Sequence, residues 1–389
     1  MPRPLEGLRV LDIGISTAGP YAARLLGDLG ADVIKVEPLD GENTRGLGLR
    51  YGDAGYLYHV NNYNKRSITL KLQHPRGRDL FLELVAKSDV VIENFAIGTM
   101  DKWGVGYAAC REANPSIIYC SVKGFGESGP LAGLRAFDTV TQAMCGLMYS
   151  TGKPGDPPLK AGPSVCDLMG AAVSSMAVMT AIAARRSDES QFLDTALFDM
   201  GAVALTSLWP LARHGSAESL RSLGNGHPEH SPFDDYACAR GRVIVTVTTD
   251  AQWRALAPLV ELPAEWDRQT RIEKRGVIDA ALSAWLAQHG AEESAERLQF
   301  LGVPAAPILD LEQVATSAQL ASRRMIGTLS HPVYGDVPLI NTPLATGEAG
   351  SRGPWRHQPV LGESNEEVIG DILGHAGELA ALRAEGVLR

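Results

Sequence analysis

The sequence predicts an α/β protein with a doubly wound parallel sheet and a second, smaller α/β domain. Three observations support this. Residues 8–37 read as strand, helix and strand, the alternation continues to about residue 210, and the composition changes over residues 214–236. Strands that alternate with helices form parallel sheets covered on both faces. The Gly-, Ser-, Pro- and His-rich stretch is typical of a linker to another domain.

The first β-α-β unit comes from three patterns. LRVLDIG (8–14) predicts a strand, PYAARLLGDLG (20–30) a helix, and ADVIKVE (31–37) a second strand. Ser16 and Thr17 lie in the turn before the helix, where backbone N–H groups can hold an anion. Because GISTAGP does not match GxGxxG, we expect a phosphate- or adenine-bearing ligand other than a nicotinamide dinucleotide.

The remaining elements follow the same two periodicities. Before the break, the sequence predicts helices over 75–88, 137–150 and 165–184, strands over 89–94 and 115–122, and a strand running into a helix over 191–209. After the break, it predicts a strand over 241–250, helices over 251–262, 276–290 and 291–302, a proline-rich loop region over 325–360 and a helical C-terminus over 363–388.

Composition excludes several classes of function. A net charge of −9 over 389 residues disfavours nucleic acid as a partner. Five cysteines without a CxxC pair predict neither a disulfide framework nor a zinc site, and suit a reducing cytoplasm. The N-terminus lacks the apolar stretch of a signal peptide, so we expect a cytoplasmic protein. His227 and His230 flank Glu229, but two histidines and one acid read better as a polar loop than as a metal site.

The apolar stretch 165–184 allows two interpretations of its place in the protein. Its length is sufficient to cross a bilayer. It also contains Asp167, a glycine and two serines, and no aromatic residues flank it. We therefore expect a helix buried in protein and no membrane partner.

Asp167, near the start of this stretch, also has two interpretations. With Ser164 it matches the S-x-x-[DE] capping box, in which the acid only completes the helix end. Alternatively, the positive helix end keeps the carboxylate ionised while apolar surroundings exclude water, which makes it a nucleophile. The two interpretations do not exclude each other.

Several long motifs resemble one family. They are GLRVLDIGISTAGPYAARLLGDLGADVIKVEP, NKRSITLKL, DVVIENFAIGTMDKWGVGY, NPSIIYCSVKGFGESGPLAGLRAFDTVTQAMCGLM, GPSVCDLMGA, GNGHPEHSPF, GVPAAPILDLEQV and PVLGESNEEVI. In this order, over nearly the whole chain, they resemble the class III coenzyme A transferases, the formyl-CoA transferase and carnitine CoA-transferase (CaiB/BaiF) family. The resemblance implies that Asp167 attacks an acyl-CoA thioester and carries first an anhydride and then a CoA thioester. Succinyl-CoA is an expected donor.

The resemblance also implies where CoA binds. It assigns Ser16, Thr17 and Ala18 to a turn along CoA, Asn94 and Phe95 to the nucleotide, Lys102 and Arg135 to phosphates and pantetheine, and Leu70 and Leu72 to the adenine, with Phe137 in the same set. Pro38 replaces an arginine that some members carry, so we expect one adenine contact to be missing. No cofactor is expected to stay bound, because CoA, acyl-CoA and a small carboxylic acid are substrates.

Two other functions are compatible with parts of the sequence. The related 2-methylacyl-CoA racemases need a base on each side of the α-carbon. They carry a histidine in a GHD motif, where this chain has Phe137 before Asp138. The missing base favours the transferase, with Asp138 assisting the acceptor or a proton. A CoA-binding protein without turnover is the third reading, and the presence of Asp167 disfavours it.

The resemblance implies a domain plan and an interlocked homodimer. It predicts a large CoA-binding domain over 1–212, a linker over 213–225, a small domain over 226–325, and a segment over 326–389 that returns to the large domain. The formyl-CoA transferase glycine loop is absent, which disfavours formyl-CoA and oxalate. We hypothesise that Arg45, Arg221 and His227 grip a second carboxylate, which would favour dicarboxylic acids.

Overall fold

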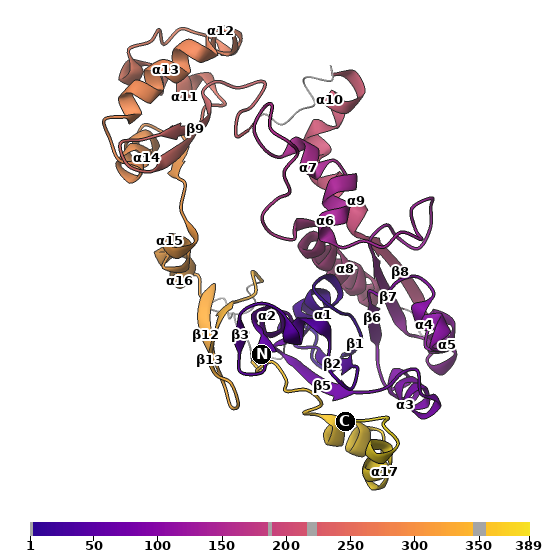
Figure 1. Cartoon of the computed structure of the whole chain (residues 1–389). Helices are drawn as coiled ribbons and strands as arrows, with labels where there is room; N and C mark the ends of the chain where they lie inside the picture. The colour runs from indigo at the N-terminus through magenta and orange to yellow at the C-terminus, as the bar shows by residue number, and fades with distance from the viewer. Residues whose placement is uncertain (1–2, 186–188, 216–223, 345–354) are drawn as a thin grey trace. The chain divides into compact units, whose positions relative to one another are not determined.

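The computed structural model describes residues 3–185, 189–215, 224–344 and 355–389 (Figure 1). The chain forms two compact units. Unit 1 comprises Met1–Leu147, Ala161–Thr206 and Ala318–Arg389, and unit 2 comprises Met148–Lys160 and Ser207–Ser317. Unit 2 is therefore inserted into unit 1 at two places, and these boundaries differ from the predicted ones at 212, 225 and 325.

Unit 1 is built on one six-stranded parallel sheet, as the alternation of strands and helices predicts. The strand order is β5-β2-β1-β6-β7-β8. The strands are β1 (Arg9–Asp12), β2 (Asp32–Glu37), β5 (Lys65–Thr69), β6 (Val90–Glu93), β7 (Ile118–Lys123) and β8 (Gln191–Ala196). In the central strand, Val10 pairs with Val33 of β2 and with Val90 of β6. The chain therefore leaves β1 first toward one edge of the sheet and later toward the other.

Both faces of this sheet are covered, because successive side chains of a strand point to opposite faces. On one face, Val10 packs in a core with α1 (Ala18–Asp28) and α8 (Val165–Ala183). On the other face, Leu11 packs with α3 (Pro75–Val85) and with the C-terminal segment. The predicted doubly wound arrangement is present (Figure 1).

Helix α8 is the predicted apolar helix, and it packs against α1, β7 and β8. One set of its side chains is buried, namely Cys166, Gly170, Ala171, Ser174, Ser175, Val178 and Ala181. Among the described residues, α8 is the one helix long and apolar enough to cross a membrane by length and composition. Its small buried residues allow close packing, since a Cβ on Gly170 would lie 2.5 Å from Leu197.

Unit 2 carries a small antiparallel sheet of order β11-β10-β9. Its strands are β9 (Phe233–Ala237), β10 (Arg242–Thr246) and β11 (Ala305–Pro307). Its helices include α11 (Asp250–Leu256), α12 (Arg268–Glu273), α13 (Arg275–Leu286) and α14 (Ala291–Phe300). A separate core around the fully buried Trp253 holds them together.

Two predicted elements differ in detail. The predicted helix over 137–150 divides into α6 (Asp138–Met144) and α7 (Leu147–Ser150), because Gly146 takes a left-handed conformation with φ 93°. The predicted proline-rich loop contains a hairpin, β12 (Ile326–His331) and β13 (Gly335–Ile340). Pro338 is tolerated there because the hairpin is a separate two-stranded sheet, which has only edge strands.

The other elements are short and complete the description. They are η1 (Asn43–Gly46), β3 (Arg50–Tyr51), β4 (Ala54–Gly55), α2 (Tyr56–Asn62), α4 (Thr99–Lys102), α5 (Tyr107–Ala113), α9 (Leu197–Ala204), η2 (Thr206–Leu208), α10 (Trp209–His214), η3 (Ala257–Val260), α15 (Leu311–Ala315), α16 (Ala318–Ser322), η4 (Glu366–Ile372), η5 (Ala376–Glu378) and α17 (Leu379–Ala384).

Candidate functional site

The candidate site lies at the carboxyl ends of the parallel strands of unit 1. Chain segments leave β1, β6 and β7 there, and the order of strands reverses between β1 and β6. In open α/β sheets, ligands bind outside the carboxyl ends of the strands at such a switch point. Most of the residues predicted to bind CoA follow one of these strand ends.

A pocket of about 70 Å³ contains Asp167, and we call it the Asp167 pocket. The structure brings six predicted residues together there, namely Ser16, Thr17, Ala18, Asn94, Phe137 and Asp167. The other lining residues are Ile15, Val122, Lys123, Gly124, Ala136 and Leu197. The lining is about half apolar, and the Asp167 side chain is partly buried in it, so the acid loses part of its hydration.

The Asp167 carboxyl is partly buried in the first turn of α8. Burial, with a smaller contribution from the charge of Asp138, raises its pKa to about 7. The expectation that the helix end keeps this acid ionised is therefore wrong in direction. The main reason is burial, and the carboxylate of Asp138 at the helix end adds to the shift.

Asp138 is the residue that caps α8. Its Oδ1 accepts hydrogen bonds from the backbone N–H groups of Cys166 at 2.8 Å and Asp167 at 3.2 Å. Ser164 occupies the N-cap position but makes no side-chain cap hydrogen bond. The predicted capping box of Ser164 and Asp167 is therefore absent. Asp138 is 6% exposed, and its role in the structure is to hold the start of α8.

The side chain of Asn94 holds the turn between β1 and α1 by hydrogen bonds to its backbone. The Asn94 side chain accepts the N–H of Ile15 and donates to the C=O of Ile15, both at 2.8 Å. Ser16 takes φ 62°, and its N–H donates to Glu42 at 3.1 Å. Gly19 completes the turn at close range, since a Cβ there would lie 3.2 Å from Asn94. The amides of Ile15 and Ser16 are thus already paired.

A buried charge cluster, which the sequence reading missed, supports the same turn. Lys65 donates to Asp12 at 2.7 Å and to the C=O of Pro20 at 2.8 Å, and Lys35 donates to the C=O of Gly14. All three charged side chains are fully buried. Burial lowers the pKa of Lys65 to about 8. The sequence signal of this cluster is the presence of Asp12, Lys35 and Lys65 within the three neighbouring strands β1, β2 and β5.

A second pocket of about 60 Å³ lies on the other side of the turn, and we call it the Leu70 pocket. It is lined by the predicted residues Leu70, Leu72 and Phe95, and by Ile13, Gly14, Ile15, Val36, Glu37, Pro38, Glu42, Gln73 and Trp103. Phe95 and Trp103 meet edge to face, with ring centroids 5.1 Å apart. Ile15 lines both pockets, so the two pockets flank one turn of chain.

The cations of this region differ in availability. Lys123 is 7% exposed, and its Nζ donates to Glu93 and to the C=O of Phe95, so its charge is matched. Lys102 ends α4 beside Trp103, and Arg135 lies two residues before Phe137. Both side chains are exposed.

Of the residues predicted to grip a second carboxylate, the structure describes Arg45 in unit 1 and His227 in unit 2. Arg45 is buried and forms a two-pronged ion pair with Glu37, with distances of 2.7 and 2.8 Å. This pairing corrects the hypothesis for Arg45, because its guanidinium is already occupied. His227 belongs to unit 2, where its Nδ1 accepts the N–H of Glu229 at 3.1 Å. Arg221 lies outside the described residues.

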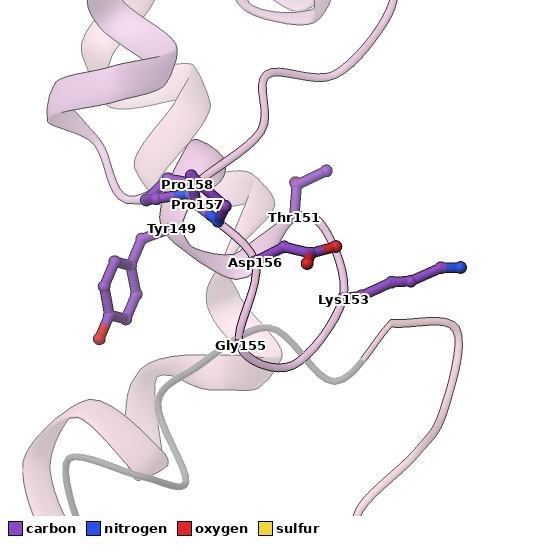
Figure 2. A pocket seen from close by; sticks show the side chains of 7 residues that line it. All are labelled: Tyr149, Thr151, Lys153, Gly155, Asp156, Pro157 and Pro158. Carbon is purple, nitrogen blue, oxygen red and sulfur yellow. The ribbon is translucent and has the colours of Figure 1, made fainter.

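A third pocket, of about 310 Å³, lies in unit 2 and was not predicted (Figure 2). It is formed by the loop after α7 and is lined by Tyr149, Thr151, Lys153, Gly155, Asp156, Pro157 and Pro158. Figure 2 shows the side chains of Tyr149 and Lys153 pointing in different directions. In the described chain, no group of three or more His, Cys, Asp or Glu side chains is placed to hold a metal ion.

Comparisons with known proteins point to one family. The model of CoA-transferase family III matches residues 5–365. A succinyl-CoA:mesaconate CoA-transferase of Haloarcula marismortui is 35% identical over 381 residues, which cover 94% of this chain and 95% of the relative. A succinate–glutarate CoA-transferase of Agrobacterium fabrum is 34% identical, with 95% and 96% covered. The crystal structure of a CaiB/BaiF family protein from Brucella suis has a TM-score of 0.82 and 32% identity, with 99% and 100% covered.

Proposed function

Because the chain belongs to CoA-transferase family III and is a CoA-transferase, we propose that it transfers CoA through covalent intermediates on Asp167. The donor is an acyl-CoA such as succinyl-CoA, and the acceptor is a small carboxylic acid. The observation that carries this proposal is the Asp167 carboxyl, which is partly buried in a pocket with several apolar side chains and does not cap α8.

The proposed chemistry balances in four steps. A carboxylate oxygen of Asp167 attacks the thioester carbonyl of the donor, and the C–S bond breaks to give a mixed anhydride and CoA thiolate. The thiolate attacks the aspartyl carbonyl, which releases the donor acid and leaves an aspartyl-CoA thioester. The acceptor carboxylate attacks this thioester, giving a new anhydride and thiolate. The thiolate then attacks the acceptor carbonyl, which yields the new acyl-CoA and free Asp167.

The pocket suits an intermediate that water would destroy. An anhydride on Asp167 must survive until the thiolate or a carboxylate reaches it. Val122, Ala136 and Leu197 line the pocket beside Asp167 and offer no hydrogen bond to a water molecule from their side chains. The raised pKa of Asp167 also makes its carboxylate a better nucleophile than an ordinary, well-hydrated one.

We propose that CoA lies across the turn between the two pockets. The Leu70 pocket offers aliphatic and aromatic side chains to the adenine, and the turn at Ser16 and Thr17 lies between it and Asp167. Lys102 and Arg135 are exposed and supply positive charge for the phosphates. CoA enters and leaves as a substrate in this scheme.

A dicarboxylic acid is the acceptor we favour. The relatives from Haloarcula and Agrobacterium are named for succinyl-CoA with mesaconate and for succinate with glutarate, and mesaconate, succinate and glutarate are dicarboxylates. His227 remains a hypothesis for the second carboxylate. We also propose that the protein acts as an interlocked homodimer in the cytoplasm, on the basis of the family resemblance.

One assay separates the three functions considered. The protein is incubated with succinyl-CoA and a panel of mono- and dicarboxylic acids in D₂O, and the CoA esters are followed by mass spectrometry. New CoA esters support CoA transfer. Incorporation of deuterium at the α-carbon without new CoA esters supports racemisation. Binding of succinyl-CoA with neither change supports a CoA-binding protein without turnover. Borohydride trapping during turnover should modify Asp167. An Asp167→Asn variant that exchanges CoA at the parent's rate would overturn the proposal.

A further inference from the structure

Gln142 of α6 is fully buried, with no exposed surface, and lies one helical turn after Asp138. Its Nε2 donates to Oδ2 of Asp138 at 2.6 Å and to the C=O of Pro163 at 3.3 Å. Its Oε1 accepts the N–H of Ala161 at 3.0 Å. One amide group therefore joins the residue that caps α8 to the segment that leads into α8.

Only an amide meets all three partners. Asp138 Oδ2 and the C=O of Pro163 need donors, whereas the N–H of Ala161 needs an acceptor. The other Asp138 oxygen is used by the N–H groups of Cys166 and Asp167. The Asp138 carboxylate is therefore fixed on both sides, by α6 on one and by α8 on the other. This arrangement also fixes the first turn of α8, which carries Asp167.

We infer that Gln142 is a positioning residue for the transfer reaction: by holding Asp138 and the 161–163 segment, it fixes the start of α8 and so the position of Asp167. The inference rests on the proposed role of Asp167 as nucleophile. A nucleophile displaced by about 1 Å can lose about 100-fold in rate, so the effect belongs in kcat. Gln142 does not line either pocket, so binding of CoA should change little.

The first test is Gln142→Met, which keeps the volume and removes the three hydrogen bonds. We expect kcat to fall about 10- to 100-fold and the KM for succinyl-CoA to stay within about 2-fold. Thr139→Ala, an exposed position on the same helix, is the matched control and should keep both constants. Circular dichroism and thermal melting establish that each variant is folded. An unchanged kcat in folded Gln142→Met would overturn the inference.

The second test is Gln142→Glu, and its readout is a pH dependence of kcat that a merely structural role of Gln142 would not produce. When protonated, a glutamic acid at this position donates to Asp138 and accepts from Ala161, and when ionised it repels Asp138. The ratio of variant to parent kcat should therefore fall as pH rises from about 6 to 8. The charge of Asp138 acts on Asp167 and Cys166 of α8, and Cys145, the residue that follows α6, interacts with Cys166. The variant leaves all of these groups in place.

The outcomes distinguish this inference from the proposed function. If Asp167→Asn is inactive and the Gln142→Glu ratio does not change with pH, the positioning role is wrong and the nucleophile stands. If Asp167→Asn retains the parent's rate, the proposed function fails regardless of the Gln142 variants. If Asp167→Asn is inactive and the ratio falls with pH, both are supported.

Discussion

At the scale of single residues, Asp167 is a carboxyl that loses water on folding, and among the described residues no cation offsets the effect of this burial on its pKa. Burial and the charge of Asp138 raise its pKa to about 7. Since only the ionised form attacks a thioester, kcat/KM for the acyl-CoA donor should rise with pH and level off above about pH 7. A pH–rate profile between pH 5 and 9 measures this. A profile already flat from pH 5 would contradict the assignment.

The contribution of Asp138 can be separated with Asp138→Asn. The substitution removes the negative charge beside Asp167 and leaves the side-chain oxygen that accepts the N–H groups of Cys166 and Asp167. The acid limb of the profile should move to lower pH. The rate should also fall, because the new amide no longer accepts from Gln142. A limb that stays in place would show that burial alone sets the pKa of Asp167.

The same pKa makes a prediction about stability. A carboxyl whose pKa is raised from 3.8 to about 7 costs folding free energy once the pH exceeds its value in the unfolded chain. Asp167→Asn should therefore leave Tm unchanged near pH 4 and raise it with increasing pH, with a plateau above pH 7 at about 2 °C or more. Melting curves of parent and variant across this range test it. A variant less stable than the parent at pH 8 would contradict it.

Residue-level reading of the sequence located Asp167 but not its electrostatic surroundings. The pattern of Ser164 and Asp167 predicts a local cap. Such a pattern gives no information about Asp138, which lies 29 residues before Asp167 and accepts the N–H groups of the helix end instead. In the folded chain, Asp138 lies next to the helix end and caps it, and the side chain of Ser164 makes no capping hydrogen bond. Gln142 was missed for the same reason, since Ala161 and Pro163 meet it only in the folded chain.

At the scale of elements, the β1–α1 turn separates the two pockets, and Asn94 sets its shape. Asn94→Leu should let the turn move and raise the KM for acyl-CoA about 10-fold, with a smaller effect on kcat. Asn114→Leu is a matched control, because the Asn114 side chain also bonds backbone groups, those of Val85 and Ser88, but lies outside both pockets. Steady-state kinetics of both variants decide it. Equal KM values for the two would contradict a role for the turn.

The ion pair of Arg45 and Glu37 leads to a prediction about stability and not about catalysis. Burial alone would raise the pKa of Glu37, but the hydrogen bonds and charge of Arg45 lower it. Arg45→Met leaves this carboxylate buried and unpaired, which should cost about 3–5 kcal/mol of unfolding free energy. The double variant Arg45→Met with Glu37→Met should recover much of it. Urea unfolding measures both. A stable Arg45→Met with altered acceptor preference would restore Arg45 to the acceptor site.

Elements with strong periodicity were predicted closely, and the others were not. Strands β1 and β2 and helix α3 follow from apolar runs of the right length. The β12–β13 hairpin was predicted as a loop because proline is normally excluded from the inner strands of a sheet. Both strands of this two-stranded sheet are edge strands, where proline is tolerated. The predicted C-terminal helix is divided into η4, η5 and α17, with Gly374 at φ 88° between the first two.

At the scale of the whole molecule, the alternating pattern of strands and helices predicted the parallel sheet. The same pattern did not predict which segments of the chain belong to each compact unit. Residues 148–160 belong to unit 2 although they lie between helices of unit 1. Which segments join one compact unit depends on contacts between distant parts of the chain. Periodicity reports only which face of each element is buried.

The surface of unit 1 leads to a prediction about assembly. Helices α6, α8 and α9 contact one another, and each exposes large apolar side chains, including Met144 at 44%, Met176 at 56% and Val203 at 60%. Where such side chains form one contiguous patch, the patch marks an interaction site. If a second copy covers it, sedimentation equilibrium should find a dimer, and Val203→Glu should weaken it at least about 10-fold. Val277→Glu, at an equally apolar exposed site on α13 of unit 2, should leave the dimer intact. A monomeric parent, or a Val203→Glu dimer as tight as the parent's, would rule out this surface as the interface.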